Sequence, residues 1–329
     1  TQVGRGREST TYQRLVALRQ CLPHHTYLQY TATPQAPLLI NLIDTLSPRF
    51  AELLTPGNDY VGGEGFFEEN PNLVRVIPAN EIPSQANRLP EVPQSLIEAL
   101  KLFFLGVATG FMRGDDQRLG SGRNRSMLVH PSRETPGHGQ FYHWITQIKQ
   151  QWLDVLNPQA DERERTQFLD SFRPACDDLR QTVPDLPDFD DLAKELPYSI
   201  RNTEVLQVNA RPITPQPDWT ITYPWILVGG QAMDRGFTVE GLTVTYMPRN
   251  MGVGNADTVQ QRARFFGYKR AYLGFCRAFL EQGLFHAFQS YVKHERDVRS
   301  RLLEHRGRPL SEWRRAFFLD SLLRPTRRQ

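Results

Sequence analysis

Short runs of apolar and β-forming residues constrain the fold of this chain more than any other feature. They lie at residues 126–129, 204–208, 225–228 and 242–247, and helical patterns lie between most of them. Runs that are apolar throughout are typical of parallel strands buried on both faces. Strands that alternate with helices build sheets of this kind. The sequence therefore predicts an α/β protein with a parallel sheet.

The strongest helical pattern lies at residues 96–111, where apolar residues recur at spacings of three and four. The apolar face consists of Leu96, Leu100, Phe103, Val107 and Phe111. A continuous face of this width is typical of a core helix rather than of a ligand groove. We therefore expect this helix to lie in the hydrophobic core.

Weaker patterns predict the remaining elements. Residues 12–22 favour a helix, and residues 26–31 favour a strand that stops before Pro34. A helix is expected near residues 38–43, and residues 55–93 are rich in glycine and proline, which indicates loops. Residues 141–196 favour amphipathic helices broken at prolines, and a helical tail is expected from about 284 to 323, with a break at 307–309.

Composition excludes several classes of protein. The chain has 329 residues, of which 39% are hydrophobic and 23% charged, as in a folded globular protein. No apolar run reaches the roughly 20 residues that span a bilayer. Cys21, Cys176 and Cys276 are too few and too far apart for a disulfide scaffold or a four-cysteine zinc site. A cytoplasmic location is therefore expected.

Charge is distributed unevenly along the chain. The net charge is +3, but residues 290–329 contain 11 Lys/Arg and 5 Asp/Glu, whereas residues 154–195 contain 12 Asp/Glu and 5 Lys/Arg. A basic tail is typical of a surface that meets nucleic-acid phosphates. The candidate DNA-binding residues are Arg299, Arg301, Arg306, Arg308, Arg314 and Arg315. The alternative is that both segments are merely solvated helical faces.

Two segments contain residue types suited to phosphate chemistry. The strand at 225–228 runs into Gly229 and Gly230, and glycines after a strand let backbone amides approach an anion closely. Further along, Gln260 and Arg264 share one face if the stretch from residue 256 is helical. An arginine held on a helix can stabilise a transferring phosphoryl group as an arginine finger. The alternative is a surface arginine paired with a carboxylate.

Taken together, the motifs resemble a known family. Thr31-Ala-Thr-Pro34, the segment 229–241 and the segment 260–269 occur in the order of motifs three, five and six of superfamily-two helicases and translocases. The resemblance is closer to one branch, the Z-one (Z1) domain family, which is named as an endonuclease domain. Its fifth motif stands here as Gly229-Gly230 and Arg235-Gly-Phe-Thr-Val-Glu-Gly-Leu-Thr243, and its sixth as Asp257-Thr-Val-Gln-Gln261 and Arg264-Phe-Phe-Gly-Tyr-Lys269.

The resemblance implies a RecA-like architecture. Residues 1–60 would end a first lobe, 61–125 would form a linker and the long helix, and 126–283 would form a second motor lobe with a helical insert at about 141–200. Residues 284–329 would form the basic helical tail. Two positions depart from the family pattern, since Ala263 replaces a glycine and Lys269 replaces an arginine. Lysine keeps the charge but loses the bidentate fork.

The resemblance also implies roles for individual residues. Arg264 would be the arginine finger, supported by Gln260 and Arg235. Asp234 and Thr238 would couple the nucleotide to DNA, and Thr31 and Thr33 would sense hydrolysis between the lobes. The remaining nucleotide-binding candidates are Gly229, Gly230, Gly236 and Lys269. The implied activity is ATP-dependent DNA translocation in a bacterial restriction-modification or phage-defence system, with nuclease or methyltransferase subunits as possible partners and no membrane partner.

Two parts of an ATP site are absent from this sequence. No Gly-x-x-x-x-Gly-Lys-Ser/Thr phosphate loop occurs, and no strand ends in the expected metal-binding acidic pair. We therefore expect both to lie in an upstream lobe of the same protein, and ATP and Mg²⁺ to be held only by that full-length protein. The chain alone, which starts at Thr1, is expected not to hydrolyse ATP.

Two other functions remain open. The chain could be a nucleic-acid-binding or scaffolding module without ATPase activity. It could also be an endonuclease with an unrecognised site, although Pro184-Asp185 is not followed by Glu-x-Lys. His138 and His143 are not spaced to converge on a metal from one helix, and no metal site is expected. No Gly-x-Ser-x-Gly elbow supports a serine hydrolase.

Overall fold

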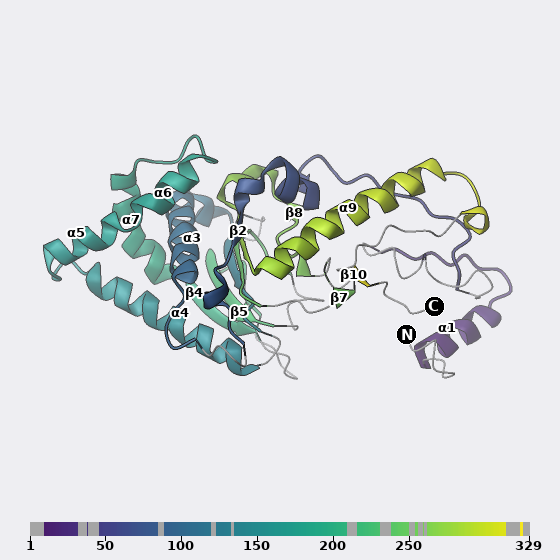
Figure 1. Ribbon diagram of the computed structural model, residues 1–329, viewed down its shortest axis with the longest axis horizontal. Coiled ribbons are helices and arrows are strands. Elements are labelled where there is room, and N and C mark those ends of the chain that lie inside the picture. Colours follow the sequence, from purple (N-terminus) through teal and green to yellow (C-terminus); the bar gives the residue numbers. More distant parts are fainter. Residues whose placement is uncertain are drawn as a thin grey trace. The chain divides into compact units, whose positions relative to one another are not determined.

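The computed structural model describes residues 10–31, 38, 46–84, 89–119, 123–132, 135–208, 216–230, 238–249, 254–255, 259, 262–313 and 323–324 (Figure 1). The chain divides into two compact units. The sheet unit contains residues 57–251 and 263–286, and the terminal unit contains residues 1–56, 252–262 and 287–329. The domain boundaries expected at residues 60, 125 and 283 stay predictions.

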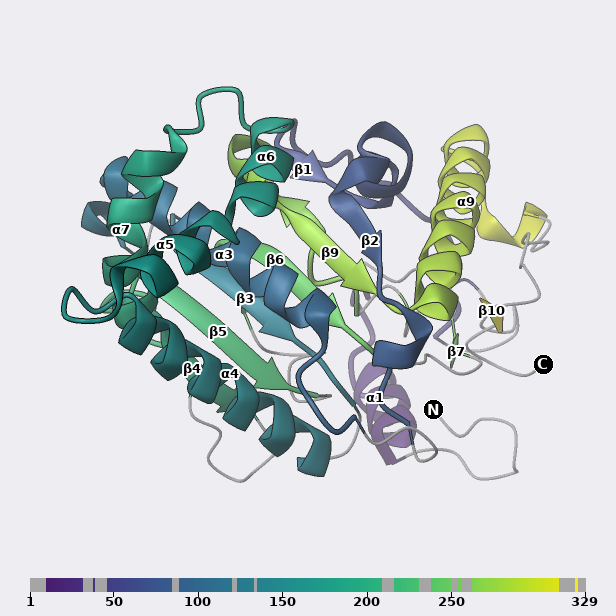
Figure 2. The ribbon, with the colours of Figure 1, turned by 60° about the vertical axis from the view of Figure 1, so that its left-hand side comes forward.

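The sheet unit is built on six parallel strands in the order β2-β9-β6-β3-β5-β4 (Figure 2). Their bounds are β2 (Val74–Val76), β3 (Arg125–Val129), β4 (Glu204–Val208), β5 (Pro224–Gly229), β6 (Leu242–Met247) and β9 (Arg277–Leu280). The four predicted strands are confirmed as β3, β4, β5 and β6. Every residue of β3 and β6 is buried, as expected for strands covered on both faces. The α/β class is therefore confirmed.

Helices cover one face of this sheet. Helix α3 (Gln94–Met112) packs on β3, β6 and β9, and α4 (Thr135–Val155) packs on β4 and β5. Both contact α7 (Phe189–Asn202), so the three helices form one layer (Figure 2). Helices α5 (Glu162–Asp170) and α6 (Arg173–Arg180) complete the predicted helical insert. Pro174 lies in the first turn of α6, where a missing amide costs nothing.

Helix α3 is the centre of the hydrophobic core. Leu96, Leu100, Phe103 and Val107 are buried, which confirms the predicted apolar face. By length and composition α3 could cross a membrane, and it is the one helix in the described ranges that passes this test. However, 72% of its most apolar window is buried within the protein. We therefore assign α3 to the core of a folded α/β unit.

Short elements fill the predicted loop region and the end of the sheet unit. Strand β1 (Tyr60–Val61) pairs antiparallel with β8 (Gly267–Tyr268). The short helical turns are η1 (Gly65–Glu69), η2 (Pro71–Leu73), η3 (Ala79–Glu81), η4 (Asp115–Arg118) and η6 (Arg270–Phe275). Residues 55–93 thus contain no long element in their described part, as predicted.

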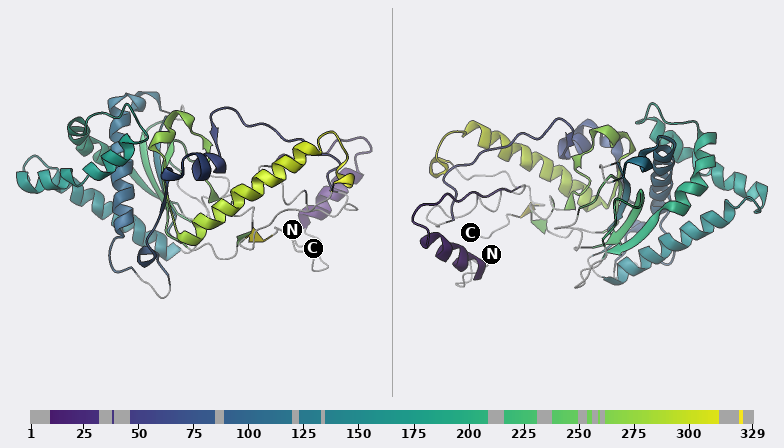
Figure 3. Two further views of the ribbon diagram at one scale, coloured as in Figure 1. Left: turned by 45° about the horizontal axis from the view of Figure 1, so that its top comes forward. Right: turned by 180° about the vertical axis from the view of Figure 1, so that it is seen from behind.

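The terminal unit contains α1 (Thr10–Gln20), most of α9 (Gln282–Glu304) and η7 (Leu310–Glu312). Strand β7 (Gly254–Asn255) pairs parallel with β10 (Leu323–Arg324). Figure 3 shows α9 as one long helix, which starts in the sheet unit. Val298 and Leu302 of α9 pack with Leu310 and Leu38 in a small apolar cluster.

Not every predicted element of the terminal unit is present. The strand predicted at residues 26–31 is wrong: these residues form no strand, and Tyr30 is 84% exposed. A β-forming sequence needs a partner strand, and none pairs with this segment among the described residues. The helix at 12–22 is confirmed as α1, and the tail predicted at about 284–323 is confirmed as α9 up to its break, where the chain turns at Gly307 with φ +77°. Beyond the break the described residues form only η7 and β10, and residues 314–322 lie outside them. The predicted helix at 38–43 lies outside the described residues except for Leu38.

A buried ion pair ties the helical insert to the sheet. Asp178 of α6 accepts a hydrogen bond from Arg277 Nε of β9 at 2.7 Å and pairs with Arg75 of β2 at 2.5 Å. The Arg277 side chain is 1% exposed. Its guanidinium also donates to Thr182 Oγ1 and to the Gly274 carbonyl oxygen. The charge of Arg277 is therefore buried only because Asp178 is present.

We expect Asp178→Asn to lower the free energy of unfolding by about 3 kcal/mol, because Arg277 would remain as a buried charge without its carboxylate. Urea unfolding followed by circular dichroism measures this difference. Asp191→Asn is the matched control, since Asp191 pairs with the exposed Lys194 and should not change stability measurably. Equal losses in the two variants would show that Asp178 has no special structural role.

Gly110 of α3 lies against Tyr223, and a Cβ at this position would lie 1.7 Å from the Tyr223 hydroxyl oxygen. Gly110→Ala should therefore destabilise the protein, although alanine favours helices over glycine by about 1 kcal/mol. The Tyr223 hydroxyl is buried and has no hydrogen-bond partner among the described residues. Tyr223→Phe should thus be tolerated alone and should recover part of the stability lost in Gly110→Ala, as thermal unfolding of the double variant would show. A fully additive double variant would contradict this packing.

Candidate functional site

The carboxyl ends of the parallel strands meet at one edge of the sheet. Strands β3 and β6 are neighbours in the sheet, but the chain continues from them in opposite directions. After β3 it runs to β4 at one end of the strand order, and after β6 it runs to β9 on the other side. Neighbouring strands whose connections diverge in this way mark the place where ligands bind in open α/β sheets. The end of β3 and the end of β6 therefore define the candidate site.

Two buried side chains join these strand ends. Arg249, two residues after β6, donates from Nη1 to His130 Nε2 at 2.5 Å, and His130 directly follows β3. The same Nη1 lies 3.4 Å from the Ser132 carbonyl oxygen. Because arginine can only donate, His130 accepts through Nε2 and is the neutral tautomer with its proton on Nδ1. His130 is 1% exposed and Arg249 is 4% exposed.

The end of β5 lies next to the same polar cluster, which consists of His130, His138 and Arg249. His138, in the first turn of α4, donates from Nε2 to the Ser132 carbonyl oxygen at 3.0 Å. A Cβ at Gly230 would lie 2.6 Å from the His138 ring, so a larger residue at this position would force the ring to move. The ends of β3 and β6 are thus held together by polar contacts, and Gly230 at the end of β5 packs closely against His138. Because its side chains are buried, this cluster acts as a rigid frame for the segments that leave the edge.

Several residues expected in the nucleotide site fall at this edge or outside the described residues. Gly229 ends β5 and Gly230 contacts His138, so both lie at the predicted edge. Thr31 and Thr238 are both exposed. The remaining candidates lie outside the described residues, namely Thr33, Asp234, Arg235, Gly236 and Gln260. The structure therefore locates the start and the end of the fifth-motif segment, whereas Asp234 and Arg235 lie outside the described residues.

Arg264 lies in a turn and not in a helix. Residues 263–266 form a turn in which the Phe266 amide donates to the Ala263 carbonyl oxygen at 3.0 Å. The helical spacing expected for Arg264 is therefore wrong at this residue. Phe265 packs edge-on against Phe66, with ring centroids 5.2 Å apart. This aromatic contact anchors the turn and leaves the Arg264 side chain half-buried.

Lys269 lies at the opposite edge of the sheet from Gly230. Its ammonium group donates to the carbonyl oxygen of Leu242, the first residue of β6, and lies 5.6 Å from the Tyr272 ring centroid. Lys269 is 3% exposed, and burial lowers its pKa. Neighbouring Cys276 is also buried, which raises the pKa of its thiol. Lys269 is therefore a core residue of the amino edge and is not brought together with the glycines.

The candidate DNA-binding arginines are mostly engaged within the terminal unit. Arg301 pairs with Asp297 at 2.8 Å and Arg306 with Glu52 at 2.6 Å. Arg308 donates to the Glu304 carbonyl oxygen at 3.0 Å. Arg299 is half-exposed on α9, and Arg314 and Arg315 lie outside the described residues. In the described ranges, no group of three or more His, Cys, Asp or Glu side chains is arranged to hold a metal ion.

The sequence contains only a partial signal for the polar cluster at this edge. His130 and Arg249 each come shortly after a predicted strand, where ligand-binding residues of α/β proteins gather. What the sequence does not reveal is that β3 and β6 are neighbours, so that these two side chains meet. From the sequence, His138 is considered only as a possible metal ligand. In the structure, His138 is a hydrogen-bond donor at this edge of the sheet.

Lys269→Met tests the buried ammonium group. The native pKa of Lys269 lies below its ordinary value of 10.5, so between these two values the unfolded chain binds more protons and native stability rises with pH. Lys269→Met should remove this rise in the free energy of unfolding, measured in urea at several alkaline pH values. The exposed Lys293→Met should retain it, and an unchanged slope in Lys269→Met would contradict the burial of a chargeable amine.

Comparison with known proteins identifies the family. A profile of the Z1 domain matches residues 95–313, from the start of α3 to the end of η7. The match includes strands β3, β4, β5, β6 and β9. Searches of curated proteins and of solved structures found no match. Since the profile covers well over half of the 329 residues, the chain belongs to the Z1 domain family.

Proposed function

We propose that this chain supplies the second RecA-like lobe, and the end of the first lobe, of an ATP-driven DNA translocase. One observation carries the proposal. Strands β5 and β6 lie on either side of β3 in a parallel sheet, so the segments that follow them both start at the carboxyl edge. These segments are the ones that resemble helicase motifs five and six, and this edge is where α/β sheets bind their ligands.

The proposal assigns a role to each segment. Arg264 would stabilise the charge that develops on the transferred phosphoryl group, and Gln260 and Arg235 would support the nucleotide. Asp234 and Thr238 would couple the nucleotide to DNA, while Thr31 and Thr33 would sense hydrolysis. The frame formed by His130, His138 and Arg249 would hold the starting points of both segments in place.

The remaining parts of the machinery would come from outside this chain. ATP and Mg²⁺ would bind in the full-length protein, because this sequence contains no phosphate loop. DNA would be the track, contacted through basic residues such as Arg299. The proposed setting is a cytoplasmic bacterial restriction or phage-defence system that includes nuclease or methyltransferase subunits. This setting rests on the family resemblance.

Arg264→Ala in the full-length protein tests the proposal. Loss of an arginine finger lowers phosphoryl transfer by about a thousandfold or more, so ATP turnover should fall by that factor while DNA binding is largely kept. Steady-state phosphate release and DNA binding by fluorescence anisotropy measure the two quantities. Arg163→Ala is the matched control, because Arg163 is an exposed arginine on α5 in the helical insert.

Unchanged turnover in Arg264→Ala would remove this residue from the mechanism. If the full-length wild type hydrolyses no ATP and binds DNA with a steep salt dependence, the chain is instead a nucleic-acid-binding scaffold. Equal losses in Arg264→Ala and Arg163→Ala would indicate a general effect on folding, which the urea midpoints of the two variants would confirm.

A further inference from the structure

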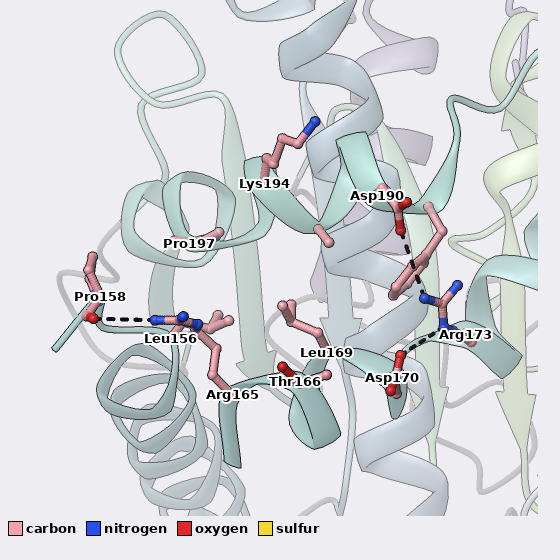
Figure 4. A pocket seen from close by; sticks show the side chains of 12 residues that line it. Leu156, Pro158, Arg165, Thr166, Leu169, Asp170, Arg173, Asp190, Lys194 and Pro197 are labelled. Carbon is pink, nitrogen blue, oxygen red and sulfur yellow. Dashed lines mark hydrogen bonds and ion pairs between the residues drawn. The ribbon is translucent and has the colours of Figure 1, made fainter. Parts of the chain in front are cut away.

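The helical insert forms an open cavity that the proposed motor function does not use. The cavity has a volume of about 450 Å³ and lies among α5, α6, α7 and the end of α4 (Figure 4). Its apolar lining consists of Leu156, Pro158, Leu169, Phe189, Ala193 and Pro197. Sites for small molecules have volumes of about 300–1,000 Å³ and mostly apolar walls with a few polar groups. The cavity fits this description.

Basic side chains gather around this cavity although the insert is acidic. Residues 154–195 contain 5 Lys/Arg and 12 Asp/Glu. Three of the five basic residues line the cavity, namely Arg165 of α5, Arg173 of α6 and Lys194 of α7. Only two of the twelve acidic residues do so, Asp170 and Asp190. The lining thus carries a net charge of +1 within an anionic segment, although Arg173 pairs with Asp170 and Asp190, and Lys194 with Asp191.

Arg165 provides a positive charge at one end of the cavity. Its Nη1 donates to the Pro158 carbonyl oxygen at 3.3 Å, which orients the guanidinium without cancelling its charge. No carboxylate lies within 4.0 Å of Arg165 among the residues that the structure places. The side chain is half-buried. A partly desolvated guanidinium without a counter-charge attracts an anionic group strongly.

Arg173 lies at the other end of the cavity and makes three contacts there. Its Nε donates to Asp170 at 2.8 Å and its Nη2 lies 3.8 Å from Asp190 (Figure 4). Its guanidinium lies over the Phe189 ring at 4.2 Å from the centroid. These contacts fix the plane of the guanidinium. Because arginine carries five N–H donors, the fixed group can present further donors to a ligand.

We propose that this cavity binds an amphipathic organic anion. The apolar body of the ligand would cover Leu169 and Phe189, and an anionic group would pair with Arg165. A longer ligand with a second anionic group would also reach Arg173. This site is separate from the sheet edge and does not depend on the proposed motor function.

Anilinonaphthalene sulfonate is a direct probe, since it has an aromatic body and one anionic group. The wild-type chain should bind it saturably, as measured by fluorescence titration. Arg165→Glu should weaken binding by about tenfold or more, because a charge-assisted hydrogen bond is lost and a repulsion is added. Arg163→Glu makes the same change two residues away on α5, outside the cavity lining, and should leave binding unchanged.

Two further measurements separate this site from non-specific adsorption. Thr166→Trp should fill the cavity and abolish probe binding while the urea midpoint stays near that of the wild type. Decanedioate should displace the probe and diaminodecane, its charge-inverted counterpart, should not. Equal weakening in Arg165→Glu and Arg163→Glu, or displacement by both compounds or by neither, would overturn the proposal.

Discussion

The contact between α3 and the sheet is the interaction on which the rest of the structure depends. One side of α3 packs on β3, β6 and β9, and the other side packs on α6 and α7. Each buried leucine or phenylalanine in such a contact contributes roughly 1.5–3 kcal/mol. The helix therefore joins the sheet and the helical insert into a single core. Asp178 and Arg277 add a second, polar link between the insert and the sheet.

The common direction of the strands decides which residues can act together. In a parallel sheet all carboxyl ends lie at one edge, so Gly230, His130 and Arg249 come together from three separate strands. The same direction separates Lys269, which bonds to the first residue of β6, from those groups. Residues of the fifth and sixth motifs are thus divided between an edge that can bind ligands, where Gly230 lies, and a buried core, where Lys269 lies.

Much of the fold could be predicted from sequence because its signals are local. Strands β3, β5 and β6 are almost entirely buried, so most of their residues are apolar or β-branched, and α3 has an unbroken apolar face. Strands β2 and β9 give a weaker signal, because they are only three and four residues long and each contains an arginine that pairs with Asp178, about a hundred residues away. The strand predicted at residues 26–31 is wrong because a local β-forming pattern is not sufficient. Its side chains have no partner strand in the described part of the chain.

The candidate site could be predicted only in part for a related reason. The glycines after β5 are visible in the sequence, because a strand that ends in two glycines is a local pattern. The contact of His130 with Arg249 depends on strand order, which joins residues 119 positions apart. Likewise the cavity in the insert is formed by helices whose packing is set by tertiary contacts, so its three basic residues look scattered in the sequence.

The most direct test of the motor assignment is the rate of ATP hydrolysis with and without DNA, measured on the full-length protein and on this chain alone. The full-length protein should hydrolyse ATP faster when DNA is present, and the chain alone should be inactive, because its sequence contains no phosphate loop. A full-length protein that hydrolyses no ATP under either condition, while it still binds DNA, would contradict the account.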